Sequence, residues 1–177
     1  TLAPAATTRS GVRAELDEKF PDHVAFYRNL LARFDLAEAP VQDDIVISSE
    51  FIEAQIAVTL EEHVPVFAAG LGDPGRVTGR AKAQGMVTLG LAGSPRNAAR
   101  QVEAGVDAVV AQGTEAGGHT GRVANFALIP QVVDAVGATP VIAAGGISDG
   151  RGIAASMALG ASGAWLGSLF LTADESD

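Results

Sequence analysis

One histidine of this chain lies in a loop that is dense in glycine. The loop reads Gln112-Gly-Thr-Glu-Ala-Gly-Gly-His119-Thr-Gly121 and directly follows an apolar run. Glycine tolerates a positive φ and lets the backbone approach a flat ligand closely. An imidazole titrates near neutral pH and suits proton abstraction or the stabilisation of an anion. The loop therefore predicts a catalytic His119. The alternative is a structural loop in which His119 only forms hydrogen bonds with its neighbours.

Two glycine turns further along the chain could bind an anion. Gly145 and Gly146 separate an apolar run from a predicted helix start, and Gly167 and Ser168 follow the next apolar run. Backbone N–H groups at a helix start can hold a phosphate, and glycine lets that ligand come close. Such turns after two consecutive strands are typical of the phosphate site of a (β/α)8 barrel.

Short apolar runs alternate with helix-length segments from residue 64 onward. The runs are Val64–Ala69, Met86–Leu91, Val106–Ala111, Pro140–Ala144 and Ala164–Phe170. The segments between them are Asp73–Ala83, Pro95–Ala104, Asn125–Val136 and Asp149–Leu159. Capping residues stand at the start of three of these segments, and a glycine follows each of the four. Strict alternation of this kind predicts a parallel sheet with helices outside it.

The placement of the glycines distinguishes two parallel folds, a doubly wound sheet and a barrel. Glycines cluster directly after the predicted strands, where barrel enzymes build their active sites. A barrel takes about 250 residues. We therefore predict an α/β fold, an incomplete (β/α)8 TIM barrel, and expect its first strands to lie before Thr1.

The first part of the chain has a different pattern. Apolar residues recur at three- and four-residue spacing between Arg13 and Phe34, and Pro21 predicts a division into two helices. Asp43-Asp44 and Ser48-Ser49 offer caps for a further helix. We assign residues 1–63 to a helical insertion or connecting segment and residues 64–177 to the C-terminal part of the barrel.

Composition excludes several classes of function. The 177 residues include 12 Lys and Arg against 21 Asp and Glu, a formal net charge of −9, which argues against a nucleic-acid partner. There is no Cys and there are three scattered His, so we expect no metal site. No apolar run reaches the roughly 18–20 residues of a membrane span, and we expect a cytoplasmic protein.

The His119 loop, together with Pro140-Val-Ile-Ala-Ala-Gly-Gly-Ile147 and Trp165-Leu-Gly-Ser168-Leu-Phe170, resembles the nitronate monooxygenase family, formerly called 2-nitropropane dioxygenases. The resemblance runs from about Val64 to the C-terminus. It implies an FMN-dependent barrel that oxidises alkyl nitronates with O2 to a carbonyl compound and nitrite. The family usually has Thr where Ser168 stands, and the exchange keeps the hydroxyl.

The resemblance also implies roles for individual residues. His119 matches the catalytic histidine, and the remaining matches are to cofactor contacts. Those contacts are Gln112, Gly117, Gly118, Gly145, Gly146, Gly167 and Ser168. The partners implied are a nitronate and O2. The sequence leaves open whether Glu115 orients His119 or caps the loop, and it leaves the assembly open, with a homodimer as one candidate.

Other functions fit parts of the same pattern. An FMN-dependent enoyl-[acyl-carrier-protein] reductase or an NAD(P)H:quinone reductase could use the same barrel, although Gln112 favours the nitronate oxidisers. A flavin-free phosphate-binding lyase or isomerase would show the same glycine turns, but no Lys lies at a strand end. The last alternative is a truncated remnant without catalytic activity, because the first strands of the barrel are missing.

Overall fold

A computed structural model of the chain describes residues 9–40, 48–70 and 74–176. The chain divides into two compact units, 1–58 and 59–177. The first unit contains the α-helices α1 (Arg9–Lys19) and α2 (Pro21–Arg33), which are separated at Pro21 as predicted. Helix α3 (Ser49–Glu61) begins where Ser48 accepts a hydrogen bond from the Phe51 N–H at 3.1 Å. The predicted cap at Asp43-Asp44 lies outside the described residues.

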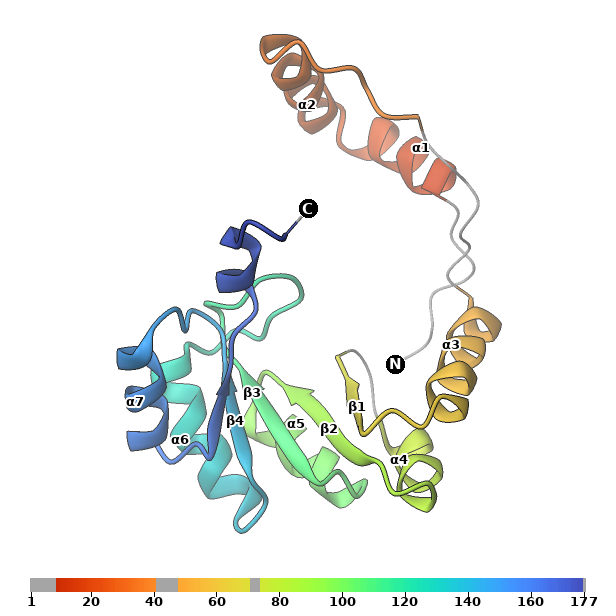
Figure 1. Cartoon of the computed structure of the whole chain (residues 1–177). Coiled ribbons are helices and arrows are strands. Elements are labelled where there is room, and N and C mark those ends of the chain that lie inside the picture. The colour runs from red at the N-terminus through yellow and green to blue at the C-terminus, as the bar shows by residue number, and fades with distance from the viewer. Residues whose placement is uncertain (1–8, 41–47, 71–73, 177) are drawn as a thin grey trace. The chain divides into compact units, whose positions relative to one another are not determined.

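The second unit is a sheet of five parallel strands with helices between them (Figure 1). The strands are β1 (Val66–Ala69), β2 (Val87–Ala92), β3 (Ala108–Gln112), β4 (Val141–Ala144) and β5 (Gly163–Trp165). The helices are α4 (Gly75–Ala83), α5 (Pro95–Glu103), α6 (Asn125–Val136) and α7 (Gly150–Ala158). The strand order is β1-β2-β3-β4-β5. A doubly wound sheet reverses direction at a switch point, whereas a barrel adds each strand beside the previous one. The order therefore confirms the barrel prediction.

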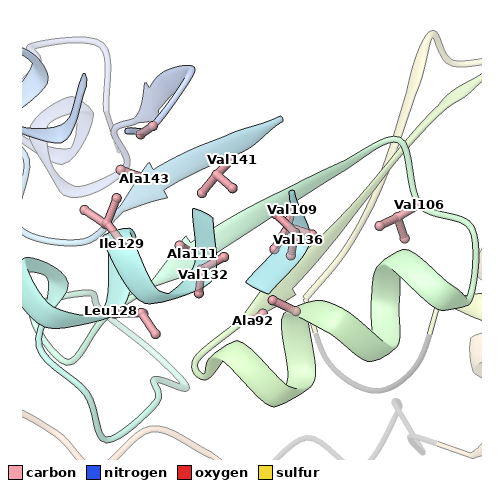
Figure 2. Close-up of a cluster of buried hydrophobic side chains, with 12 residues drawn as sticks. Ala92, Val106, Val109, Ala111, Leu128, Ile129, Val132, Val136, Val141 and Ala143 are labelled. Atoms are coloured by element: carbon pink, nitrogen blue, oxygen red, sulfur yellow. The ribbon is translucent and has the colours of Figure 1, made fainter. Parts of the chain in front are cut away.

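The two faces of the sheet differ in burial. The core lies between the sheet and its helices, where α6 packs on β3 and β4 (Figure 2). Leu128 and Val132 of α6 are fully buried there with Val109 and Ala111 of β3. Complete burial of one such aliphatic side chain stabilises the fold by about 1.5–3 kcal/mol. On the other face, which is the barrel interior, exposure depends on the strand: the register partners Val66 of β1 and Val87 of β2 are 45% and 46% exposed, whereas Val110 of β3 is fully buried.

Two of the three predicted capped starts and all four predicted glycine ends agree with the structure, and the remaining predicted cap, Asp73, lies outside the described residues. Ser94 accepts a hydrogen bond from the Asn97 N–H at 3.3 Å and caps α5. Asp149 caps α7 by accepting from the N–H groups of the following residues Arg151 and Gly152. A glycine with positive φ follows each of the four helices at Gly85, Gly105, Gly137 and Gly160, with φ between 60° and 98°. A left-handed residue after the last helical turn ends each helix without the cost that a side chain would add.

The last strand is shorter than predicted. The run 164–170 predicts one strand, whereas β5 ends at Trp165 and a 3-10 helix, η1 (Ser168–Thr172), follows. The Phe170 N–H bonds back to the Gly167 carbonyl at 3.0 Å. Phe170 and Leu171 are 65% and 73% exposed, so these apolar side chains do not enter the core. β5 pairs with β4 alone in the described sheet, and no second neighbour extends its ladder.

Candidate functional site

The predicted site residues follow the carboxyl ends of β3, β4 and β5. Gln112 is the register partner of Ala144, and Ala144 is the partner of Trp165. The loops that begin at Gly113, Gly145 and Leu166 therefore leave the sheet at one edge. This is the edge where (β/α)8 barrels bind ligands.

These loops come into contact because glycines stand at the points of closest approach. A Cβ on Gly145 would lie 2.8 Å from the Ala116 backbone nitrogen, and a Cβ on Gly146 would lie 2.9 Å from the Glu115 Cβ. The His119 loop and the Gly145-Gly146 turn are thus in direct backbone contact. A Cβ on Gly117 would lie 3.9 Å from the Ser168 Oγ, which brings the third turn to the same place.

The His119 loop is closed at its base. The Thr114 N–H donates to the Val123 carbonyl at 3.1 Å, and the Gln112 side-chain amide donates to the Gly117 carbonyl at 3.4 Å. Gly118 has a φ of 73°, where a residue with a side chain would be strained. His119 follows it and is exposed. The loop presents the imidazole to solvent from a closed backbone frame.

Glu115 caps a helix ten residues further along the chain. Both of its carboxylate oxygens accept from the Asn125 N–H at 3.0 Å. Asn125 is the first residue of α6, and the preceding Ala124 has no side chain that could cap the helix. A carboxylate at this position satisfies an unpaired N–H and interacts favourably with the helix dipole. The structure therefore assigns Glu115 to the start of α6.

Two residues of the site are not among those that the sequence predicts. The Asn125 side-chain amide donates to the Gly145 carbonyl at 2.5 Å and so joins α6 to the second turn. Gly93 follows β2, and a Cβ there would lie 2.6 Å from the Gly121 Cα. The run Gly93-Ser94-Pro95 after an apolar strand was the available signal for Gly93. An Asn at a helix start gives no signal that its side chain bonds to a distant turn.

Backbone donors for an anion are present away from the capped starts of α6 and α7. Asp149 already accepts from two N–H groups at the start of α7, and the bond from the Arg151 guanidinium holds the pKa of that carboxyl below its ordinary value. Within the described residues, the N–H groups of Gly145, Gly146 and Ser168 donate no hydrogen bond. These unpaired donors at one edge fit a phosphate group.

Among residues 9–40, 48–70 and 74–176, no group of three or more His, Asp or Glu is placed to hold a metal ion. No helix among the same residues is long and apolar enough to cross a membrane.

The sequential parallel strands, with glycine loops gathered at one edge, define part of a (β/α)8 barrel whose candidate site lies at the strand ends. The chain belongs to the nitronate monooxygenase family, whose profile matches residues 15–177. A Staphylococcus aureus protein named "Probable nitronate monooxygenase" is 40% identical over 143 residues, which are 75% of this chain and 40% of that protein.

Solved structures show the same likeness. FabK from Thermotoga maritima superposes with a TM-score of 0.70 at 41% identity, over 74% of this chain and 42% of that one. Nitroalkane oxidase from Streptomyces ansochromogenes gives a TM-score of 0.65 at 37% identity, over 82% of this chain and 44% of that one. The chain thus spans about two fifths of the length of these relatives.

Proposed function

We propose that this chain supplies the catalytic loop and the phosphate-binding turns of an FMN-dependent enzyme that oxidises alkyl nitronates with O2 to a carbonyl compound and nitrite. The observation that carries the proposal is the contact between the His119 loop and the Gly145-Gly146 turn at the carboxyl edge of a family barrel. The name of the solved nitroalkane oxidase supports the same class of substrate.

Each predicted site residue would have one of three roles: binding the FMN phosphate, lining the flavin ring or binding the nitronate. The N–H groups of Gly145, Gly146, Gly167 and Ser168, with the Ser168 hydroxyl, would hold the FMN phosphate. Gln112, Gly117 and Gly118 would line the flavin ring, since glycine lets the backbone approach its flat surface. FMN supplies the redox chemistry when it is bound. The exposed imidazole of His119 would hold the nitronate anion by hydrogen bonding or as a cation, which stabilises negative charge at the reacting group.

The test compares two histidine variants of the full chain. His119→Asn should lower kcat/KM for a nitronate, followed as O2 uptake and nitrite release, by about 100-fold or more. His63→Asn is the matched control, because His63 is exposed and precedes the amino end of β1, at the opposite edge. Its φ of 48° also suits Asn. Unchanged nitronate turnover in His119→Asn would rule out the assignment.

A second measurement addresses the competing reductases. The visible spectrum of the FMN-loaded chain is recorded anaerobically after addition of a nitronate and, separately, of NAD(P)H. We expect the nitronate to bleach the flavin absorbance. Bleaching by NAD(P)H alone would replace the proposal with a reductase, and absence of flavin binding would favour the flavin-free alternative.

A further inference from the structure

The side chain of Asn125 is seated between two glycines from different loops. Its Nδ2 donates to the Gly145 carbonyl at 2.5 Å. A Cβ on Gly113 would lie 2.2 Å from its Oδ1, and a Cβ on Gly145 would lie 3.1 Å from its Nδ2. The amide is therefore fitted to a space that exists only because both loops carry glycine there.

The hydrogen bond from Asn125 fixes the direction of a peptide group. The Gly145 carbonyl and the Gly146 N–H belong to the same peptide, and the described chain contains no cis peptide bond. In a trans peptide the carbonyl and the N–H point in opposite directions. Because the carbonyl points toward Asn125, the Gly146 N–H points away from it and donates no hydrogen bond within the described residues.

A peptide between two glycines needs such a restraint. Gly145 and Gly146 have φ values of 109° and 66°. Glycine adopts positive and negative φ about equally readily, so its residue type alone does not fix these values. Without the Asn125 amide, the peptide could rotate and turn the N–H elsewhere. An anion would then have to bind and order the donor in one step, which weakens binding.

Glu115 holds Asn125 in its position. Its carboxylate accepts from the Asn125 backbone N–H through both oxygens, and its Cβ lies where a side chain on Gly146 would stand. The same helix start is thus bonded to the His119 loop through its backbone and to the Gly145-Gly146 turn through its side chain.

We propose that Asn125 is a positioning residue that presents the Gly146 N–H to an anionic group of the ligand, and that Glu115 acts through Asn125 by capping α6. The inference rests on the proposed function in naming the anion as the FMN phosphate. It extends that function by assigning roles to two residues that touch neither flavin nor nitronate in the proposed arrangement.

The experiment removes the donor without adding charge. Asn125→Ala in the full chain should weaken FMN binding, measured by flavin fluorescence, by about tenfold or more, the loss expected for one hydrogen bond to a charged group. Gln131→Ala is the matched control. Gln131 lies on the same helix and its amide also donates to a backbone carbonyl, that of Ala127 at 2.8 Å, away from both loops.

A second readout reports the peptide itself. The Gly146 amide signal of ¹⁵N-labelled protein should move in Asn125→Ala before any ligand is added, and inorganic phosphate should shift it less than in the parent chain. Glu115→Ala should weaken FMN binding in the same direction. The double variant Glu115→Ala/Asn125→Ala should bind FMN no more weakly than Asn125→Ala. Glu115 acts only through Asn125, so the effects of the two substitutions should not add.

The outcomes separate this inference from the proposed function. If the parent chain binds no FMN but phosphate shifts the Gly146 amide through Asn125, the positioning role stands and the flavin assignment fails. If Asn125→Ala binds FMN as tightly as Gln131→Ala, the positioning role is overturned whatever the activity shows. A parent Gly146 amide that phosphate and FMN both leave unmoved overturns it too. Urea unfolding of each variant confirms that a folded protein was compared.

Discussion

Replacing Gly121 by alanine tests the close approach between the loops that follow β2 and β3. A Cβ at this position would lie 2.5 Å from the Gly93 carbonyl oxygen and 2.7 Å from the Gly93 Cα. Since real Cβ atoms stay beyond 3.0 Å, one of the two backbones must move by at least 0.5 Å, the difference between 3.0 and 2.5 Å. Extra atoms forced into a packed site cost about 1–3 kcal/mol, and we expect the free energy of unfolding to fall by that amount.

Gly79→Ala provides a control of opposite sign. Gly79 lies inside α4, and a Cβ there would meet no atom within 4 Å. Alanine in a helix interior is favoured over glycine by roughly 0.5–1 kcal/mol, so this variant should be more stable than the parent chain. Urea unfolding followed by circular dichroism measures both changes. A Gly121→Ala protein with the parent midpoint would show that the two loops do not touch as described.

Two further predictions concern the stability of the sheet. Leu128→Ala should lower the free energy of unfolding by about 2–5 kcal/mol in the same urea assay, because Leu128 is fully buried between α6 and the sheet; a loss below 1 kcal/mol would contradict that packing. Asp107 precedes β3, where partial burial raises its pKa but the bonds from Lys82 and from both donors of Thr88 outweigh this and hold the pKa below its ordinary value of 3.8. A carboxyl with a lowered folded-state pKa stabilises the fold above about pH 3.8, and this contribution is lost as the pH falls through the folded-state value. Asp107→Asn should therefore lower the urea midpoint at pH 6 and change it less at pH 2.5; an equal difference at both pH values would refute the linkage.

Local sequence signals were sufficient for most of the fold. Serine and aspartate at helix starts, with glycine after helix ends, defined α5 and α7 to within a residue or two, because capping is decided by neighbours along the chain. The run 164–170 was assigned wrongly for the opposite reason. Its apolar composition matches that of a buried strand, but a strand also needs neighbours across the sheet, and composition does not reveal how far its ladder extends.

The candidate site was predictable where it depends on residue type and not where it depends on tertiary contacts. The glycines of the loops could be recognised because a positive φ or a close approach excludes other residues. The hydrogen-bond partner of Glu115 could not be recognised from the sequence, since the Asn125 N–H is ten residues away along the chain. It lies close to Glu115 only because the bond from the Thr114 N–H to the Val123 carbonyl closes the loop. The bond from Asn125 to Gly145 spans twenty residues and joins two different strand ends.

The charges at the helix starts change how an anion could be held here. The sequence pattern predicts binding at the start of α7, but Asp149 fills that position and Glu115 fills the start of α6. Because each carboxylate accepts from N–H groups at the start of its helix, neither helix dipole is free to stabilise the ligand. The anion would therefore be bound by N–H groups of the glycine turns. These groups carry no charge, so they contribute only when they point toward the anion. Because of this, the direction of the Gly146 N–H, and with it the side chain of Asn125, should matter more in this protein than at an uncapped helix start.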